Sequence, residues 1–430
     1  MTKRLLILAS KLGYQTRSFA EAAQKLGVEV VFATDRCHQL DDPWQDRAIP
    51  LHFENPEEAA QRILVVARHQ PVDAILALGD RPTVAAAHAA RLLGLTYNSP
   101  ESVENCRSKL RQREVLRVAG LPVPDFFSFP LQEDPASELP RVRFPCVLKP
   151  LSLAASQGVV RANDPEEFQA AVRRIKALLE SPEIQVTREP TLDRLLVEGY
   201  LPGDEVAVEG LLDRGTFRTL AIFDKPERLE GPFFEETIYV TPSRLPREHQ
   251  AQIVDCAERT VRALGLTHGP VHAEFRINAD GPWVLEAAPR PIGGLCSRAL
   301  RFGPEKIFLE ELLVRHALGM EGSDLPREEN ASGVMMIPVP QSGIFEDAEG
   351  VEEAGRTPGV DEIRITARKH DYIAAWPEGS SYLGFIFARG ALPEEVVAAL
   401  RQAHAKLRFV FAPRLPVEHP VTGHVPVGDR

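Results

Sequence analysis

Two glutamates in neighbouring predicted strands have the residue type and spacing of a metal site. Glu274 lies in the predicted strand 271–277 and Glu286 in the predicted strand 283–287, joined by the turn 278–281. Asn and Gly in this turn favour a hairpin, which can place the two glutamates opposite each other. Carboxylates held that close repel unless a cation lies between them, and Mg2+ binds carboxylate and phosphate oxygens. The pair therefore predicts a metal clamp on a nucleotide triphosphate. The alternative is two solvated charges on a surface hairpin.

The residues around this hairpin add to the prediction. Strand alternation puts His272, Glu274 and Arg276 on one face. Beyond Glu286 the chain continues to Arg290 and then to a pair of glycines. An arginine can stabilise negative charge on a transferring phosphoryl group, and paired glycines let the backbone approach a ligand closely. The alternative role for Arg290 is a salt bridge.

Lysines near these motifs are informative because the chain has only ten, against forty arginines. Lys149 ends the predicted strand 144–150, and Lys109 begins the predicted helix 109–119. Between 154 and 158 lies a loop of small residues whose backbone N–H groups suit phosphate contacts. Taken alone, this loop is equally consistent with an ordinary flexible connection.

Composition excludes several classes of protein. The 430 residues suggest about three domains, with an ordinary balance of 44% hydrophobic and 26% charged residues. A net charge of −11 argues against a nucleic-acid-binding surface. The five cysteines never form CxxC, which favours reduced thiols. No segment has the apolar length of a membrane helix or a secretory leader core, so we expect a cytoplasmic protein.

The first hundred residues alternate short apolar strands with helical patterns. Strands are predicted at 5–9, 28–33 and 73–78, and helices at 18–26, 63–68 and 84–93. This alternation predicts βαβ units and a parallel sheet. The turn after the first strand lacks GxGxxG, so neither a dinucleotide site nor a dehydrogenase is supported.

The rest of the chain mixes strands and helices. Helices are predicted at 166–179 and 250–264, and strands at 195–198 and 205–212. The charged segment 321–330 is typical of a linker. Beyond it, a small α+β domain is predicted from strands 334–339, 362–366 and 382–388 and the helix 393–407.

In this order the motifs resemble the ATP-grasp superfamily over most of the chain. The resemblance lies in Cys106–Lys109, Gly120–Pro124, Phe144–Pro150, Leu196–Glu205, His272–Glu274 and Leu285–Arg290. It implies an α/β and α+β protein with a Rossmann-like parallel-sheet domain at 1–105, a two-lobed ATP-grasp domain at 106–320 and a C-terminal α+β lid domain at 321–430. The smaller lobe would span about 120–200, with a hinge near 198–201.

The resemblance also implies roles in binding ATP. Two lysines would contact its phosphates under a closing loop at 156–159, while the adenine edge and the ribose would meet the hinge and the strand after it. These cofactor-binding residues are Lys109 and Lys149 for phosphate, Ser156 and Gly158 for the loop, Glu198 with the backbone of Tyr200 and Leu201 for adenine, Glu205 for ribose, and Lys225 near phosphate or substrate.

The same resemblance assigns the reacting centre. Glu274 and Glu286 would bind Mg2+, with Mn2+ as an alternative ion, and Arg290 would stabilise an acyl phosphate. Many members carry Asn two residues after the second metal glutamate, where this chain has Ala288. The number of bound metal ions is therefore not fixed by the sequence. The phosphate loop also has Ala154 and Ala155 where glycines are common.

Within the superfamily, the chain resembles the dipeptide-forming L-amino-acid ligases. The resemblance rests on the segment 233–242, the turn 290–294 and C-terminal motifs at 343–345, 358–360 and 383–388. It implies substrate contacts at Glu235 or Glu236, because a buried ammonium needs a carboxylate, and at Gly293 and Gly294. Such enzymes often have His three residues after that glutamate, where this chain has Tyr239.

These patterns predict an ATP-dependent carboxylate–amine ligase that joins amino acids through an acyl phosphate. The partners would be small carboxylate and amine substrates, with a homodimer suggested by the family and no nucleic acid or membrane. The alternatives are a related ligase with another carboxylate or amine, a carboxylase, and a non-catalytic nucleotide-binding protein. No biotinyl segment supports the carboxylase, and retention of both glutamates, both lysines and Arg290 argues against a decayed site. The two substrates are not identified by the sequence.

Overall fold

The N-terminal part of the chain is a parallel sheet covered by helices. A computed structural model describes residues 2–10, 12–36, 45, 47–227, 229–379 and 381–413. The sheet has the order β3-β2-β1-β4, with every pair parallel. Apolar runs buried on both faces, such as Leu5–Leu8, are what a covered parallel sheet requires. The elements are β1 (Arg4–Ala9), α1 (Tyr14–Lys25), β2 (Glu29–Asp35), β3 (Ile49–Leu51), α2 (Pro56–Ala67), β4 (Ala74–Leu78) and α3 (Thr83–Leu93).

Two short helices lead from this sheet into the smaller lobe. Ser99 caps α4 (Pro100–Arg107) and Ser108 caps α5 (Lys109–Val118), each accepting a backbone N–H of the first turn. The lobe is an antiparallel sheet, β5-β8-β6-β7, with the apolar face of α7 packed on it. Its elements are β5 (Phe126–Pro130), α6 (Pro135–Glu138), η2 (Leu139–Arg141), β6 (Cys146–Pro150), β7 (Val160–Ala162), α7 (Pro165–Leu179), α8 (Pro182–Gln185) and β8 (Arg194–Gly199).

The larger lobe is built on an eight-stranded sheet of order β13-β12-β9-β10-β11-β16-β20-β18. The predicted hairpin is its edge, and it pairs Glu274 with Glu286 in register. The apolar face of α9 packs against this part of the sheet. The elements of this region are β9 (Asp204–Asp213), β10 (Thr216–Asp224), β11 (Ile238–Thr241), α9 (Arg247–Leu264), β12 (Gly269–Asn278), β13 (Gly281–Ala288), η3 (Cys296–Ala299), β14 (Arg301–Phe302), β15 (Ile307–Phe308) and α10 (Leu309–Ala317).

The C-terminal segment continues the same sheet. β16 pairs with β11, so strands from beyond residue 330 extend the sheet of the larger lobe. The division of the chain near residue 320 therefore crosses one hydrogen-bonded sheet, and the three domain boundaries stay predictions. The elements are β16 (Ala331–Ile337), β17 (Gly343–Glu349), α11 (Val351–Gly355), β18 (Val360–Ile365), β19 (Tyr372–Ile373), β20 (Gly384–Gly390), α12 (Pro393–His404) and β21 (Arg408–Ala412).

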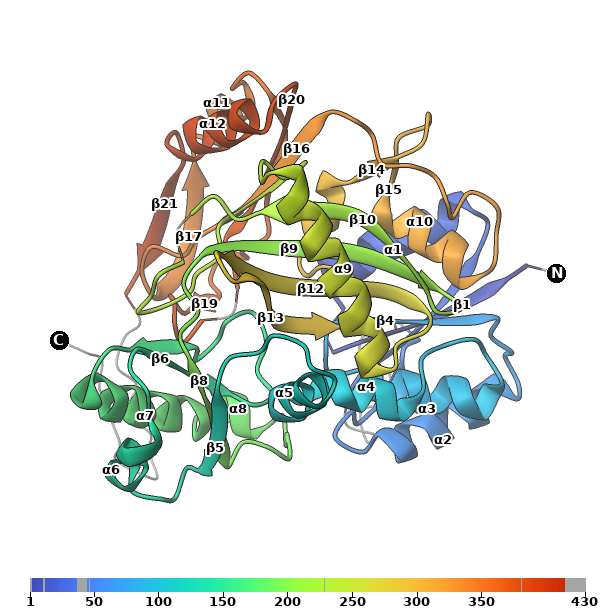
Figure 1. Cartoon of the computed structure of the whole chain (residues 1–430). Helices are drawn as coiled ribbons and strands as arrows, with labels where there is room; N and C mark the ends of the chain where they lie inside the picture. Colours follow the sequence, from blue (N-terminus) through green and yellow to red (C-terminus); the bar gives the residue numbers. More distant parts are fainter. Residues whose placement is uncertain are drawn as a thin grey trace.

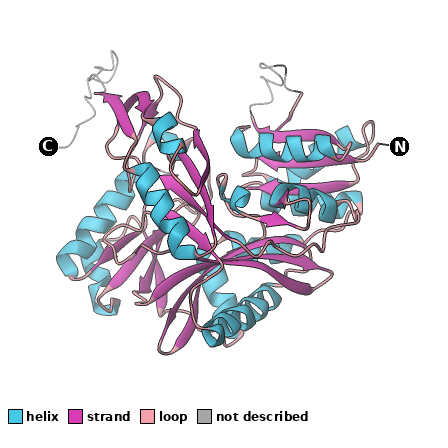
Figure 2. Ribbon diagram, turned by 90° about the horizontal axis from the view of Figure 1, so that it is seen from above, coloured by secondary structure: helices cyan, strands magenta, loops and turns pink. Residues whose placement is uncertain are grey.

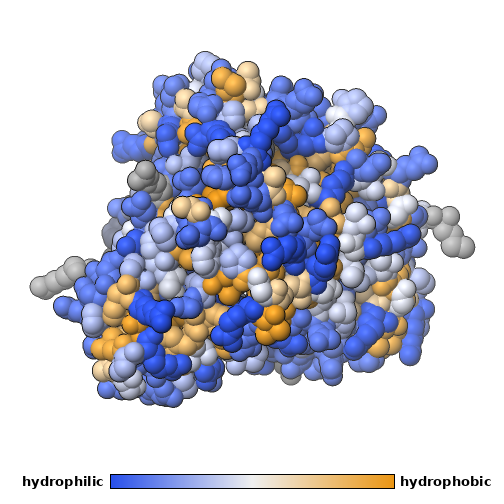
Figure 3. All heavy atoms as spheres, viewed as in Figure 1, coloured by the Kyte–Doolittle hydropathy of each residue, from blue (hydrophilic) through white to orange (hydrophobic). Residues whose placement is uncertain are grey.

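The arrangement in space matches the expected α/β and α+β fold. The larger sheet runs through the centre, with the smaller lobe below it and the C-terminal elements above and to the left (Figure 1). Viewed from above, the N-terminal end of the chain lies among layered strands and helices on the right (Figure 2), and one face of the N-terminal sheet shares a core with the larger lobe. Hydrophilic residues cover most of the face in Figure 3, and apolar residues show mainly over the smaller lobe and around α5.

Two further findings concern the cysteines and membrane spans. Cys106, Cys146, Cys256 and Cys296 are buried and free of disulfides, whereas Cys37 lies outside the described residues. Burial raises the pKa of the Cys256 thiol to about 11 and that of Cys146 to about 12. Among the described residues, every helix is too short or too polar to cross a bilayer.

Candidate active site

A cleft between the two lobes collects most of the predicted ATP-binding and metal-binding residues. It lies where the hinge after β8 faces the hairpin β12–β13. Predicted residues that line the cleft are Lys109, Lys149, Ser156, Glu198, Tyr200, Leu201, Glu205, Glu236, Glu274 and Glu286. The other predicted residues, Gly158, Lys225, Glu235, Arg290, Gly293 and Gly294, are not part of this lining.

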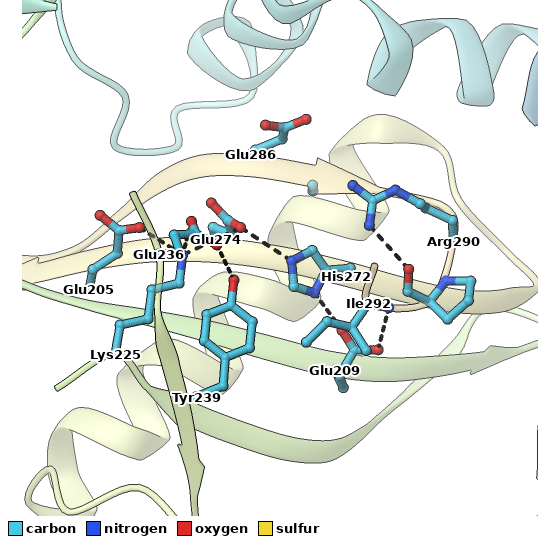
Figure 4. Close-up of polar contacts among 12 residues, drawn as sticks. Glu205, Glu209, Lys225, Glu236, Tyr239, His272, Glu274, Glu286, Arg290 and Ile292 are labelled. Carbon is cyan, nitrogen blue, oxygen red and sulfur yellow. Dashed lines mark hydrogen bonds and ion pairs between the residues drawn. The ribbon is translucent and has the colours of Figure 1, made fainter. Parts of the chain in front are cut away.

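The hairpin holds the two predicted metal ligands side by side. Glu274 and Glu286 are register partners, and their carboxylates point to the same side of the sheet (Figure 4). Lys109 Nζ lies 4.0 Å from Glu286 Oε1 and donates to the carbonyl of Leu153 at 2.6 Å. The Glu286 side chain is 32% exposed, so its oxygens face the cleft. Hard oxygen ligands on neighbouring strands, with lysines for phosphate nearby, fit a Mg2+–nucleotide complex.

The Glu198 side chain, predicted to contact adenine, is instead buried against two cationic side chains. Its carboxylate is 3% exposed and pairs with Arg113 Nε at 2.7 Å and with Lys149 Nζ at 2.7 Å. Burial alone would raise the pKa of Glu198, but Arg113 and Lys149 lower it to about 2. Glu198 therefore holds Lys149 at the cleft, and its own carboxylate is already paired with two cations.

We expect Glu198 to make stability depend on pH in the acid range. Its folded pKa of about 2 lies below the ordinary glutamate pKa of 4.5, so its stabilisation is present above pH 4.5 and is lost as pH falls toward 2. The linkage amounts to about 3 kcal/mol. Urea unfolding from about pH 7 down to about pH 3 should show Glu198→Gln losing less stability on acidification than the wild type. Glu180→Gln, at an exposed site of the same lobe, is the control. Parallel curves for wild type and Glu198→Gln would contradict this assignment.

Lys225 fills a pocket of carboxylates beneath the cleft. Its side chain is 2% exposed, and Nζ lies 2.8 Å from Glu205, 2.6 Å from Glu236 and 3.4 Å from Glu274 (Figure 4). Burial alone would lower the pKa of Lys225, but the three carboxylates hold it well above its usual value. The ammonium therefore supplies the cation for this cluster, and Lys225 orders the predicted ribose, substrate and metal glutamates.

Glu236 has a second partner in Tyr239, whose hydroxyl donates to Glu236 Oε2. Burial and the charge of Glu274 raise the pKa of Glu236, and Lys225 opposes them. Glu235 is placed differently, because its Oε1 is buried without a hydrogen-bond partner among the residues that the structure describes, and Glu235 does not line the cleft. Of the two candidate ammonium partners, Glu236 is thus the one that faces the cleft.

A histidine continues the charge network behind Glu274. His272 Nδ1 lies 2.5 Å from Glu209 Oε1, and His272 Nε2 lies 3.2 Å from Glu274 Oε1. Burial alone would lower the pKa of His272, but Glu209 and Glu274 raise it to about 9. Glu209 Oε2 also accepts the backbone N–H of Ile292 at 3.3 Å (Figure 4). The network fixes Glu274 and ties it to the turn that carries the predicted substrate glycines.

Arg290 reaches across to the N-terminal domain. Its Nε and Nη2 donate to Asp80 Oδ1 and Oδ2 at 2.7 and 3.1 Å, and Nη1 donates to the carbonyl of Pro291 at 3.1 Å. Although burial alone would raise it, the pKa of Asp80 is lowered by Arg290, Arg107 and Lys109. The salt bridge considered as an alternative is thus present, and it holds the guanidinium at the end of β13.

Gly158 and Gly294 shape turns beside the cleft. Gly158 has φ +71°, and a Cβ there would meet Pro150 Cγ at 2.9 Å. Gly294 has φ +63°, and a Cβ there would meet Phe385 Cζ at 2.9 Å. Both turns need a residue without a side chain. The loop at Gly158 also contacts the C-terminal segment, because its N–H donates to the carbonyl of Pro377 at 3.3 Å.

Comparison with known proteins identifies the family. The model of the ATP-grasp domain matches residues 142–299, that of the ATP-grasp N-terminal domain matches 20–96, and that of the L-amino acid ligase C-terminal domain 2 matches 335–412. The chain belongs to the ATP-grasp superfamily. The resemblance to the L-amino-acid ligase branch is confirmed by the match of its C-terminal domain.

Several individual proteins are similar to this ATP-grasp protein. The L-amino acid ligase from Bacillus licheniformis has a TM-score of 0.81 and 29% identity, covering 96% of this chain and 99% of that one. Alanine–anticapsin ligase from Bacillus subtilis is 28% identical over 65% of this chain and 62% of its own length. Carnosine synthase 1 from Gallus gallus is 30% identical over 81% of this chain and 40% of its own length. The chain thus spans less than two thirds of the curated relatives named here.

Several residues of this ATP-grasp site were not predicted from sequence. Arg113 and Asp80 pair with predicted site residues from a helix and a loop distant in the chain, and Glu209 lies behind His272. Arg276 lines the cleft, where it donates to Glu205 at 2.9 Å and to the carbonyl of Leu201 at 2.7 Å. The sequence offered one indication for Arg276, because it lies two residues after Glu274 and therefore on the same face of the strand. Asp80 follows the carboxyl end of a parallel strand, where ligand sites gather.

Proposed function

We propose that this protein is an ATP-dependent carboxylate–amine ligase that joins two amino acids through an acyl phosphate. The observation that carries the proposal is the register pairing of Glu274 with Glu286 in a cleft that also holds Lys109 and Lys149. Carboxylates for a divalent ion and cations for phosphate are thus combined in one cleft. The L-amino acid ligase C-terminal domain supports amino acids as the substrate class.

The cleft offers a position for each part of ATP. The backbone of Tyr200 and Leu201 would contact the adenine edge, and Glu205 would accept from the ribose. Arg276 donates hydrogen bonds to both Glu205 and the carbonyl of Leu201, so it fixes the hinge relative to the proposed ribose position. Lys149 and Lys109 would contact the phosphates, and the charge of Lys149 is already held in the cleft by Glu198.

Glu274 and Glu286 are the residues that would hold Mg2+, and the arrangement of their carboxylates fits that ion. When bound, Mg2+ neutralises phosphate charge and aligns the triphosphate. Ala288 is 3% exposed and offers no side-chain ligand at the position where many family members carry Asn. The metal site of this chain therefore draws on the two glutamates alone among the predicted ligands.

The reaction then follows from charge and position. A substrate carboxylate oxygen attacks the γ-phosphorus of ATP, the bond from that phosphorus to the ADP oxygen breaks, and an acyl phosphate forms. The amine of the second amino acid attacks the carbonyl carbon, loses a proton, and phosphate leaves as the amide forms. Lys109, Lys149 and Arg290 offset repulsion between the anions, and positioning supplies much of the rate.

Substrate recognition would centre on Glu236. Its carboxylate lies at the cleft, with one oxygen paired to Lys225 and the other to Tyr239. Each oxygen keeps a second lone pair that could accept from a substrate ammonium. Tyr239 stands where relatives of this branch often carry His, so we expect the amino-acid preference to differ from theirs. The loop at 154–158 and the segment 377–378, which contact each other, would shield the acyl phosphate from water.

The proposal is tested by a phosphate-release screen over all pairs of proteinogenic amino acids with ATP and Mg2+, followed by mass spectrometry of the product. We expect phosphate release that requires both amino acids, together with a dipeptide mass. ATP binding without phosphate release from any pair would instead favour a different carboxylate or amine, or a non-catalytic nucleotide-binding protein. The expected cytoplasmic location and homodimer stay predictions.

A further inference from the structure

A second group of potential metal ligands lies away from the ATP cleft. Asp213 ends β9, His268 lies in the loop before β12, and His316 lies in the last turn of α10. One donor atom from each side chain lies within 4.8 Å of the other two. His268 Nδ1 is 3.9 Å and His316 Nε2 is 4.0 Å from Asp213 Oδ1. None of these residues lines the cleft of the proposed ligase.

Both histidines present a nitrogen without a hydrogen-bond partner in the described part of the chain. These atoms, His268 Nδ1 and His316 Nε2, are buried, and the His316 residue is only 8% exposed. A buried polar atom left unpaired costs about 1–3 kcal/mol. Two such atoms facing the same carboxylate point to a ligand that both can bind.

The two imidazole rings lie against each other, and their donor atoms lie within 4.8 Å of each other and of Asp213. The rings stack with centroids 4.5 Å apart, so the two unpaired nitrogens lie beside each other.

The loop that carries His268 is already fixed by hydrogen bonds. Asn98 Oδ1 accepts the N–H groups of Thr267 and His268 at 2.8 and 3.0 Å, and Asn98 Nδ2 donates to the carbonyl of His268 at 2.7 Å. Gly215 N–H donates to the carbonyl of Thr267 at 2.7 Å, which ties the loop to the turn beside Asp213. Ligands held on such a frame lose little entropy on binding.

We propose that Asp213, His268 and His316 form a second metal site, for a borderline divalent transition ion such as Zn2+. Two imidazole nitrogens, a carboxylate and a water complete the four-coordinate shell that Zn2+ prefers. Donors around tetrahedral Zn2+ lie about 3.4 Å apart, so the site closes by about half an ångström on binding. The Asp213 side chain, 67% exposed, is free to rotate inward. Arg214 and Arg218 lie close enough to affect the histidines, but Arg218 donates to the carbonyls of Ser323 and Leu325.

The site would clamp three separate parts of the larger lobe. It joins the β9–β10 turn and the loop before β12 to the end of α10. Bound Zn2+ should therefore raise the melting temperature, since it binds the folded chain and not the dispersed ligands of the unfolded one.

The site is tested by equilibrium dialysis of Zn2+ against the chelator-treated full chain, in excess Mg2+ that would fill the metal site proposed for the ATP cleft. We expect one Zn2+ per chain, and at least about tenfold weaker binding in Asp213→Asn and His316→Gln. Asp213→Asn is the decisive variant because an exposed carboxylate is not needed for folding. His69→Gln, an exposed histidine at the end of α2, is the matched control and should bind as the wild type does.

Co2+ provides an independent readout, since a tetrahedral site gives intense visible absorption. We expect that absorption in the wild type and its loss in Asp213→Asn. Wild-type Zn2+ affinity in both Asp213→Asn and His316→Gln would overturn the proposal. So would Zn2+ binding that disappears only in Glu286→Gln, because that result places the ion in the ATP cleft.

Discussion

Glu286→Gln is expected to reduce ATP-dependent phosphate release by at least about 10²-fold in kcat, with the fold unchanged. The glutamine keeps the shape of the side chain but removes the charge that would hold Mg2+. Its structural cost is small because Glu286 is 32% exposed and its one ion pair among the described residues, with Lys109, is 4.0 Å long. Phosphate release at saturating substrates, with urea unfolding of the same samples, measures both quantities.

A control on the same hairpin separates metal binding from damage to the strand. Asp280→Asn changes a carboxylate to an amide in the exposed turn and should keep wild-type turnover. Raising Mg2+ should recover part of the activity of Glu286→Gln, which a purely structural defect would not allow. Wild-type turnover in Glu286→Gln would remove the metal assignment.

Arg290→Lys is expected to lower kcat by about 10²-fold with little change in the KM for ATP. Arg290 lies outside the lining of the ATP cleft, so its loss should affect the transferring group more than nucleotide binding. A lysine keeps the charge but cannot form the two-pronged contact with Asp80 or place N–H groups in the same plane. Steady-state kinetics over ATP and amino-acid concentration distinguish the two parameters.

Asp80→Asn tests whether the N-terminal domain positions Arg290. We expect a smaller fall in kcat, about tenfold, because an amide still accepts one hydrogen bond. Since both changes disturb one contact, the double variant should be less impaired than the product of the single effects. Full additivity, or an unchanged kcat in Arg290→Lys, would contradict the role given to this arginine.

Local pattern was enough to predict much of this protein. The turn residues predicted the hairpin that brings Glu274 and Glu286 onto neighbouring strands. Their direct pairing also needs a β-bulge between Glu274 and Phe275, which shifts the register by one residue and which the turn and the strand period alone do not give. The alternation of strands and helices likewise predicted the parallel N-terminal sheet. The family resemblance added the assignments of Lys109 and Lys149, which the structure brings to the same cleft.

Only the tertiary structure decided the partners of these residues. Arg290 meets Asp80 from 210 positions away, and Glu198 meets Arg113 from 85 positions away. The Lys225 ammonium lies among Glu205 of β9, Glu274 of β12 and Glu236 of the segment before β11. The pairing of β11 with β16, which extends the central sheet into the C-terminal segment, was likewise not predicted from the sequence. Sequence spacing determines contacts within a helix or a regular hairpin, because backbone geometry repeats there, whereas the bulge between Glu274 and Phe275 breaks that repeat. Contacts between elements depend on how whole lobes pack, and no local period encodes that.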